Sequence, residues 1–464
     1  MRPTRWRRST HVVIGVVVLI VVGAVVAVAA MVGGAHTTSE AQAPPAPAPA
    51  TAEPAVVPVA DDAPVPTPNG MAQALALPVA DPNLGAITGR IADADTGAVL
   101  WQQGAAIPMQ PASTNKTLTS SAALLTLARD ARVTTRVMTA DQAAQSGVVV
   151  LVGGGDPTLS AAPPGQDTWY RDAARISDLA DQVRRTGTKV TAIQVDTSFY
   201  SGPTLAPGWD PADIDGGDIA PMESVMLDAG RIQPTTVDSG RSLTPALDAG
   251  RALAIALKVD PATVTVVSGI RAPSSGKELA SVQSAPLIER LNEMMNDSDN
   301  VMAEAIGREV AAATKHPVSF AGAVDAVTAR LTAANIDLTG AVLMDSSGLS
   351  VDDRLTATTL DEVMGEAAGP DQPKLRPLLD VLPIAGGSGT LSNRFLDPPN
   401  ERASAGWLRA KTGSLTGTNA LAGVVTDAGG RVLTFAFISN NAGPTGRLAI
   451  DALAATLRTC GCGS

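Results

Sequence analysis

Histidine and cysteine are scarce in this 464-residue chain, and their positions exclude several kinds of site. The only histidines are His11, His36 and His316, and the first two precede the region that we expect to fold. A Ser-His-Asp or Cys-His catalytic unit therefore has one candidate histidine at most, and a His-rich metal site is excluded. The two cysteines, Cys460 and Cys462, lie at the C-terminus, where they could pair in an oxidising compartment. The body itself is thus neither stapled by disulfides nor built around zinc.

Basic and aromatic residues are also few. The chain has 34 Lys and Arg against 45 Asp and Glu, a formal net charge of −11, and only 3% aromatic residues. Nucleic-acid binding needs clustered Lys and Arg together with stacking aromatics, so this composition excludes a nucleic-acid partner. With 45% hydrophobic and 17% charged residues, the chain can bury a large core, and its length allows two or three domains.

A long uncharged apolar segment lies near the N-terminus. Residues 12–35 are rich in Val, Ala, Ile and Gly and would form a helix about 36 Å long, enough to cross a hydrocarbon core about 30 Å thick. The arginine-rich residues 1–11 predict a cytoplasmic tail, which places the rest of the chain across the membrane. The length of the run favours a single-pass transmembrane signal anchor, and a cleaved signal peptide is the alternative. Both interpretations place the folded body on the cell-wall or periplasmic side of the cell membrane.

A Pro- and Ala-rich stretch, residues 36–82, follows the apolar segment. Nine prolines fall between Pro44 and Pro68. Such a composition favours extended polyproline II structure, which predicts a semi-rigid linker. The rest of the chain then divides into a catalytic domain made of residues 83–140 and 276–458, an inserted region at 141–275 and a tail at 459–464.

Apolar periodicity predicts an α/β body. Residues 85–105 show the pattern of a hairpin, and residues 406–439 show a second one. Helical patterning dominates residues 284–313 and 320–334, whereas short Val- and Ile-rich runs make the inserted region β-rich. Strands near both chain ends, with helices between them, predict one antiparallel sheet flanked by helices.

The first motif with catalytic chemistry is Ser113-x-x-Lys116, at the start of a predicted helix. Residues three apart lie on one face of a helix, so the hydroxyl and the amine can touch. Because the body has almost no histidine, a neutral lysine is the available base for a serine nucleophile; burial and the helix N-terminus favour that neutral form. A second match, Ser274-x-x-Lys277, contains glycine and follows a proline, so we interpret it as a chance match in a loop.

Ser298-Asp299-Asn300 is a second candidate motif, within a predicted helical stretch. All three residue types cap helices well, so a helix N-cap is one interpretation. The functional interpretation has the Ser298 hydroxyl pass a proton while the Asn300 amide holds the substrate or the lysine.

Lys411-Thr412-Gly413-Ser414 ends a predicted strand and is the third candidate motif. A solvated lysine before a turn is one interpretation. In the other, Gly413 lets a ligand approach the backbone and Lys411 supplies charge for a substrate carboxylate, to which the hydroxyls of Thr412 and Ser414 hydrogen-bond.

In this order the three motifs are the signature of penicillin-binding proteins and serine β-lactamases. The long separation of Ser113 from Ser298 disfavours a compact β-lactamase. Residues 84–458 resemble the D-alanyl-D-alanine carboxypeptidase/endopeptidase family, the class C low-molecular-mass penicillin-binding proteins (DacB-like serine peptidases). The matching segments are PASTNK, GGGDPTLS, SDNVMAEAIGREV, DSSGLS, LPIAGGSGTLSNRF and RAKTGSLTGTNALAG.

The resemblance implies a fold and an activity. The fold is a penicillin-binding-protein/β-lactamase-like transpeptidase domain, interrupted after the nucleophile helix by an inserted region. The activity is that of a serine peptidase that removes D-Ala from peptidoglycan stem peptides, or cuts their cross-links, through an acyl-enzyme. It implies inhibition by β-lactams such as penicillins and requires no cofactor and no metal. A β-lactamase-like hydrolase and a non-catalytic wall-binding scaffold are the alternative functions.

The resemblance also implies roles for the motif residues. The nucleophile would be Ser113, with Lys116 as its base, and the backbone N–H groups of Ser113 and Ser414 would form the oxyanion hole. Asp156 and Asp345 lie in matching segments, where a turn role and a catalytic role both stay open. The remaining roles are proton relay for Ser298, positioning for Asn300, carboxylate binding for Lys411, and substrate binding for Thr412, Gly413 and Ser414.

Overall fold

The computed structural model describes residues 20–25, 27, 62–140, 147–267, 276–460 and 462. The chain divides into two compact units, Met1–Pro58 and Val59–Ser464. In the first unit residues 20–25 are helical, and most of the predicted membrane segment lies outside the described residues. Among the helices that are described, none has the length and apolar character needed to cross a membrane. The anchor therefore stays a prediction.

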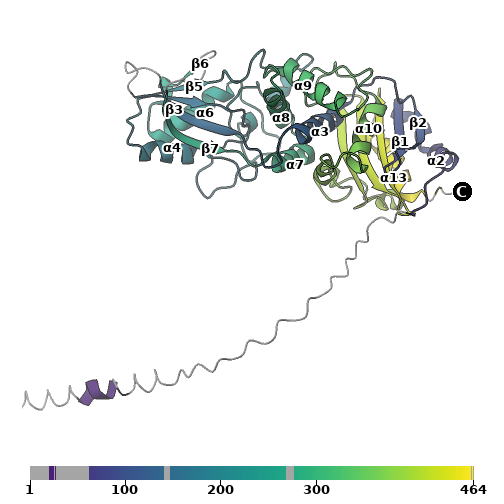
Figure 1. Ribbon diagram of the computed structural model, residues 1–464, viewed down its shortest axis with the longest axis horizontal. Coiled ribbons are helices and arrows are strands. Elements are labelled where there is room, and N and C mark those ends of the chain that lie inside the picture. The colour runs from purple at the N-terminus through teal and green to yellow at the C-terminus, as the bar shows by residue number, and fades with distance from the viewer. Residues whose placement is uncertain are drawn as a thin grey trace, which may run out of the picture. The chain divides into compact units, whose positions relative to one another are not determined.

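One five-stranded antiparallel sheet contains strands from both ends of the second unit (Figure 1). Its order is β2-β1-β10-β9-β8, and β1 pairs with β10 from Ala86 opposite Asn440 to Asp93 opposite Leu433. The predicted sheet built from both chain ends is thus confirmed. The strands are β1 (Ala86–Asp93), β2 (Val99–Gln103), β8 (Leu408–Leu415), β9 (Thr418–Thr426) and β10 (Val432–Asn440).

Helices cover both faces of this first sheet. Successive side chains of a strand point to opposite faces of the sheet. In β10, Phe435 and Phe437 belong to the hydrophobic cluster that contains the buried residues of α13. Ala436 and Ile438 belong to the cluster that contains the buried residues of α10. The sheet therefore has a buried face on each side. The two helices are α10 (Ala357–Ala368) and α13 (Gly446–Thr459).

A second five-stranded sheet comes from the middle of the chain, in the order β6-β5-β4-β3-β7. Strands β4, β5 and β6 pair in parallel, and β3 is antiparallel to both β4 and β7. Because β3 and β7 belong to this sheet, it extends beyond the predicted insert, 141–275, on both sides. Its elements are β3 (Thr134–Thr139), β4 (Val148–Val152), α4 (Ile176–Arg185), β5 (Ala192–Asp196), α6 (Pro245–Leu257), β6 (Thr265–Val267) and β7 (Glu278–Gln283).

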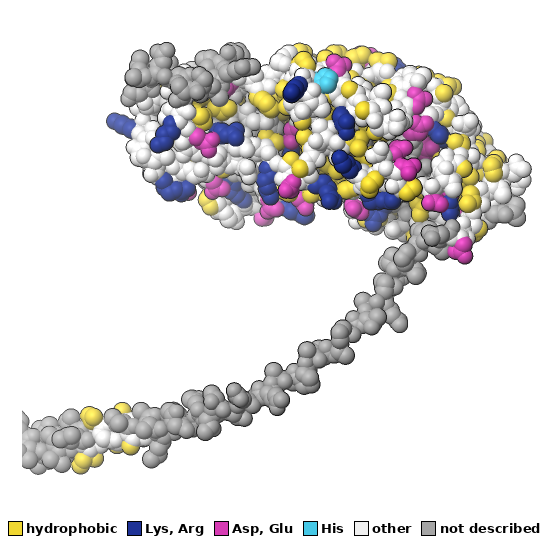
Figure 2. All heavy atoms as spheres, in the orientation of Figure 1, with side chains coloured by type: hydrophobic (Ala, Val, Ile, Leu, Met, Phe, Trp, Pro, Cys, Tyr) yellow, Lys and Arg dark blue, Asp and Glu magenta, His cyan; other side chains and the backbone are white. Residues whose placement is uncertain are grey.

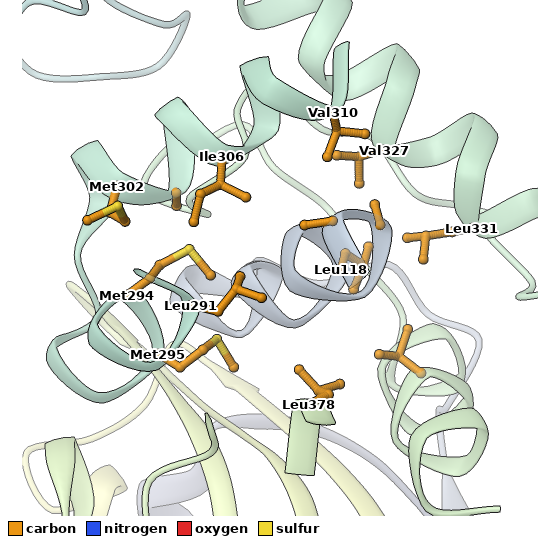
Figure 3. Packing of buried hydrophobic residues seen from close by; sticks show 14 of the residues in the cluster. Leu118, Leu291, Met294, Met295, Met302, Ile306, Val310, Val327, Leu331 and Leu378 are labelled. Atoms are coloured by element: carbon orange, nitrogen blue, oxygen red, sulfur yellow. The ribbon is translucent and has the colours of Figure 1, made fainter. Parts of the chain in front are cut away.

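The largest hydrophobic core surrounds the helix that follows Ser113. Leu118 of this helix is fully buried, with side chains of α7, α8, α9 and α11 around it (Figure 3). This packing keeps water away from the first turn of the helix, where Lys116 lies. The helices are α3 (Lys116–Thr126), α7 (Leu287–Asp297), α8 (Asn300–Ala313), α9 (Phe320–Thr332) and α11 (Pro377–Val381); α5 (Ala212–Gly216) and α12 (Pro399–Arg402) are short.

Charged side chains are spread over the surface of the second unit. On the face shown in Figure 2, Lys and Arg side chains lie among Asp and Glu side chains and do not merge into one basic patch.

The end of the predicted linker is folded, which corrects the assignment of residues 36–82 as a spacer. Helix α2 (Pro68–Leu75) begins with a proline at its first position and is capped by Thr67, whose side chain accepts the backbone N–H of Gly70 at 3.1 Å. Met71 and Leu75, four residues apart on one helix face, are fully buried. Proline content suggested an extended chain, but here a proline begins a helix whose apolar face packs on the body.

The C-terminal tail holds this helix in place. Cys460 and Cys462 form a disulfide, a pairing that the sequence left possible. The carbonyl oxygen of Cys462 accepts the backbone N–H of Thr67 at 2.9 Å. The two ends of the second unit are therefore joined directly.

We predict that Leu75→Ala destabilises the protein by about 2–5 kcal/mol, because it leaves a cavity under α2. Leu77 lies just after the helix and is 86% exposed, so Leu77→Ala is the matched control, with an expected change below about 0.5 kcal/mol. Urea unfolding of both variants measures the difference. Equal stability of the two variants would contradict the docking of α2.

Candidate active site

Ser113 lies in a tight turn just before α3. The turn, Ala112–Asn115, is a 3-10 helix, and Ala112 has a φ of 48°, in the left-handed region. Gly348 packs so closely on this turn that a Cβ there would lie 2.0 Å from the carbonyl oxygen of Ala112. The half-buried Ser113 side chain places Oγ 2.9 Å from Nζ of Lys116. The two groups of the first motif therefore touch.

The Lys116 amine has two further partners, both of them carbonyl oxygens. Nζ donates to Oδ1 of Asn300 at 2.6 Å and to the backbone oxygen of Ser347 at 2.8 Å. Lys116 is fully buried. Burial lowers its pKa to about 8, although nearby carboxylates, Asp345 first among them, oppose the shift. A neutral amine is therefore accessible near physiological pH.

Ser298 faces a second lysine. It ends α7 with a φ of 59°, and its Oγ accepts a hydrogen bond from Nζ of Lys411 at 2.9 Å. Lys411, on β8, is also fully buried and donates to the backbone oxygen of Thr412 at 3.0 Å. Burial and then the charge of Lys116 lower the pKa of Lys411 well below its ordinary value. The structure thus places two Ser–Lys pairs in one site.

Asp299 and Asn300 are held by the inserted region. Asn300 donates through Nδ2 to the backbone oxygen of Asp218 at 3.1 Å, which leaves Oδ1 for Lys116. Asp299 caps α8 by accepting the N–H of Met302, as the helix-cap interpretation expected. Its other oxygen accepts the hydroxyl of Tyr170 at 2.5 Å. Within this motif, Asp299 is therefore the helix cap, and Asn300 contacts Lys116.

The third motif lies on β8, an edge strand of the first sheet. Thr412 Oγ1 lies 2.8 Å from Oγ1 of Thr390, and Ser414 is exposed. Gly413 packs against the nucleophile turn: a Cβ there would lie 2.6 Å from the carbonyl oxygen of Pro111. Glycine is needed here because β8 passes so close to the turn, a contact that the sequence did not reveal.

Two aspartates from the matching segments make turns. Asp156 accepts the N–H and the hydroxyl of Thr158 through one oxygen. Asp345 accepts the N–H groups of Gly348 and Ser350 and the indole N–H of Trp209, at 2.6, 2.8 and 2.7 Å. Of the two roles left open by the sequence, the contacts with Thr158, Gly348 and Ser350 are those of turns, whereas Trp209 reaches Asp345 from the inserted region.

Other candidates from the sequence lie elsewhere. Ser274, in the second Ser-x-x-Lys match, lies outside the described residues. His316 lies beyond the end of α8, where Nδ1 is 2.9 Å from the hydroxyl of Thr314. Within the described ranges, no group of three or more His, Cys, Asp or Glu side chains could hold a metal ion.

Comparison with known families decides the classification. The pattern of the D-Ala-D-Ala carboxypeptidase 3 (S13) family matches residues 71–241 and 239–458. The chain belongs to this family. It is a serine-type D-alanyl-D-alanine carboxypeptidase of the penicillin-binding-protein type, as its motifs predicted. Residues 1–58 match the N-terminal domain of the Carboxypeptidase Rv3627c-like proteins.

Individual relatives agree with this assignment. The chain is 70% identical over 465 residues to Carboxypeptidase DacB of Mycolicibacterium smegmatis and 65% identical over 464 residues to Carboxypeptidase Rv3627c of Mycobacterium tuberculosis, with 100% of each chain covered. A D-alanyl-D-alanine carboxypeptidase of Actinomadura sp. is 30% identical over 453 residues, covering 81% of this chain and 82% of that one.

A solved structure shares the fold. Penicillin-binding protein 4 (dacB) from Haemophilus influenzae aligns with a TM-score of 0.66 at 23% sequence identity, covering 84% of this chain and 98% of that one. The S13 carboxypeptidase thus has the expected α/β fold, with its antiparallel sheet and flanking helices.

We predict that Gly413→Ala slows acylation by a labelled penicillin by roughly 10²-fold, because the added methyl group displaces the nucleophile turn. Gly365→Ala is the control: this α10 glycine has open space at its Cβ position, and alanine favours a helix. Circular dichroism checks both folds. Acylation of Gly413→Ala at the wild-type rate would contradict the tight contact.

Proposed function

We propose that this carboxypeptidase removes the terminal D-Ala of peptidoglycan stem peptides through an acyl-enzyme on Ser113. The observation that carries the proposal is the hydrogen-bond pattern of the Lys116 amine. A neutral amine has two hydrogens and one lone pair. Asn300 and Ser347 offer two carbonyl oxygens for the hydrogens, which leaves the lone pair for the hydroxyl hydrogen of Ser113.

Acylation would then proceed in a defined order. Ser113 Oγ attacks the carbonyl carbon of the penultimate D-Ala as Lys116 takes its proton. The oxyanion that forms is stabilised by the backbone N–H groups of Ser113 and Ser414. The proton passes to the leaving D-Ala amine through Ser298, and water later cleaves the ester.

Lys411 would bind the terminal carboxylate of the substrate. In the free site its charged form is disfavoured by burial and by Lys116. A substrate carboxylate would favour the ammonium form again, because an opposite charge at close range raises the pKa of an amine. The hydroxyls of Thr412 and Ser414 supply hydrogen bonds to the same carboxylate.

The same site would react with β-lactams, which acylate a nucleophilic serine through their ring carbonyl. The related penicillin-binding protein 4 of H. influenzae is also known in complex with a β-lactam. Attack by Ser113 on either compound needs the same base, so both reactions depend on Lys116.

We also propose that residues 12–35 anchor the chain in the cell membrane, with the body on the outer side, where peptidoglycan lies. The uncharged length of the segment and the arginines before it support this topology. The disulfide between Cys460 and Cys462 also suits an oxidising compartment.

Labelling with a fluorescent penicillin tests the nucleophile. We expect one adduct, mapped by mass spectrometry to Ser113 and absent in Ser113→Ala, together with release of D-Ala from muropeptides by the wild type. Ser274→Ala, in the second Ser-x-x-Lys match, should label normally. An adduct on another serine would refute the assignment; labelling without any cleavage of muropeptides would favour the scaffold.

A separate variant tests the base. Lys116→Arg keeps a positive charge but removes an accessible base, since guanidinium does not deprotonate in proteins. We expect a loss of acylation of at least ~10² with the fold intact. Because only neutral Lys116 can accept a proton, the wild-type rate should rise with pH and level off above about 8. Lys411→Arg should be milder, since that position needs charge. Near-normal acylation by a folded Lys116→Arg would exclude lysine as the base.

A further inference from the structure

Glu304 is a fully buried acid that takes no part in the proposed catalytic steps. It lies on α8 one turn after Asn300, so the two side chains share a helix face. One carboxylate oxygen accepts the backbone N–H of Ser346 at 2.9 Å, and the other accepts a hydrogen bond from Arg308 at 3.2 Å. The Arg308 guanidinium is itself buried and lies 4.0 Å from the ring centroid of Phe320.

The contact with Ser346 fixes one end of a short loop, residues 345–348. The peptide group between Asp345 and Ser346 is held on both sides, because its C=O accepts Nδ2 of Asn115 at 3.1 Å while its N–H donates to Glu304. The next carbonyl, that of Ser346, accepts the hydroxyl of Thr119 at 2.6 Å. Two consecutive peptides of the loop are thus fixed by α3, by the turn before it and by α8.

The same loop carries the carbonyl that contacts the catalytic amine. The peptide between Ser347 and Gly348 donates its N–H to Asp345 at 2.6 Å and offers its C=O to Lys116 at 2.8 Å. Its position depends on the peptides before it, which Glu304 helps to hold. Helix α8 therefore sets two of the three partners of Lys116, one through Asn300 and one through Glu304.

We propose that Glu304 is a positioning residue for Lys116, which holds the Ser347 carbonyl against the amine and places a buried negative charge behind it. The proposal rests on the proposed role of Lys116 as the base.

Several charged groups face these two residues. Burial, followed by the charge of Asp345, raises the pKa of Glu304 to about 7, against the lowering effect of Arg308. An ionised Glu304 in turn favours the ammonium form of Lys116 and keeps its pKa higher than burial alone would. The groups that face Lys116 are Asp345, Asp299, Glu304, Asp218 and Lys411; those that face Glu304 are Asp345, Arg308, Asp353 and Lys116.

Two substitutions of Glu304 separate its hydrogen bond from its charge. Glu304→Gln keeps an acceptor for Ser346 and removes the charge, so the acid limb of the pH–rate profile for acylation of Ser113 should move to lower pH by about 0.5–1 unit. Its rate at the plateau should stay within roughly 10-fold of wild type. Glu304→Ala also removes the acceptor, and its plateau should fall by at least a further ~10-fold.

Glu309→Gln is the matched control. Glu309 lies on the same helix and pairs with another buried arginine, Arg290, but contacts none of the partners of Lys116. It should lose stability in the same way without moving the acid limb. If Glu304→Gln unfolds because Arg308 loses its counter-charge, the double variant Glu304→Gln/Arg308→Gln carries the same test.

The outcomes separate this proposal from the proposed function. An acid limb of Glu304→Gln at the wild-type pH, or one that Glu309→Gln moves equally, would overturn the positioning role. A plateau of Glu304→Ala equal to that of Glu304→Gln would overturn the role of the hydrogen bond. Absence of an adduct at Ser113 in the wild type would instead contradict the proposed function.

Discussion

The buried amine of Lys116 is the interaction on which the rest of the site depends. An amine without water must find partners in the protein, and here three oxygen atoms within 2.9 Å supply them. They come from the turn before α3, from the start of α8 and from the loop after α9. The packing of the central core around α3 brings these three segments together, so the chemistry of the base is set by the fold.

Two opposing effects, burial and the charge of nearby carboxylates, set the pKa of Lys116. Burial alone would make Lys116 a weakly basic amine that rarely holds a proton. The carboxylates of Asp345, Asp299 and Glu304 act in the opposite direction, and the pKa settles at about 8. A base with a pKa near the working pH is both deprotonated often enough and basic enough to be useful. The second lysine, Lys411, is affected in turn: burial and then the charge of Lys116 lower its pKa well below the ordinary value.

The inserted region takes part in this framework although it carries none of the three motifs. Tyr170 binds Asp299, the backbone of Asp218 binds Asn300, and Trp209 binds Asp345. The first two contacts reach the Ser298-Asp299-Asn300 motif, and the third reaches the loop 345–348 that contacts Lys116. The insert therefore supports the site, and its removal would leave buried polar groups without partners.

Local sequence patterns were enough to identify the three motifs and the apolar N-terminal segment. They were also enough to predict the helices around residues 284–334 and the sheet built from both chain ends. These features depend on short spacings and on periodicity, which a single chain displays directly. The first sheet could be expected because strands with turn residues between them lie at the two ends.

Only the tertiary structure decided what surrounds the motifs. Ser347 and Tyr170 show no spacing that links them to Lys116 or Asp299, because their contacts join segments far apart in the chain. Glu304 lies one turn after Asn300, but its contact with Ser346 is also long-range. Helix α2 could not be predicted, for the same reason. The proline-rich sequence around it indicates an extended linker, and only the structure shows that Met71 and Leu75 are buried. Local sequence determines which backbone conformations are favourable. Burial and long-range hydrogen bonds then decide which conformation is adopted and which side chains share one site.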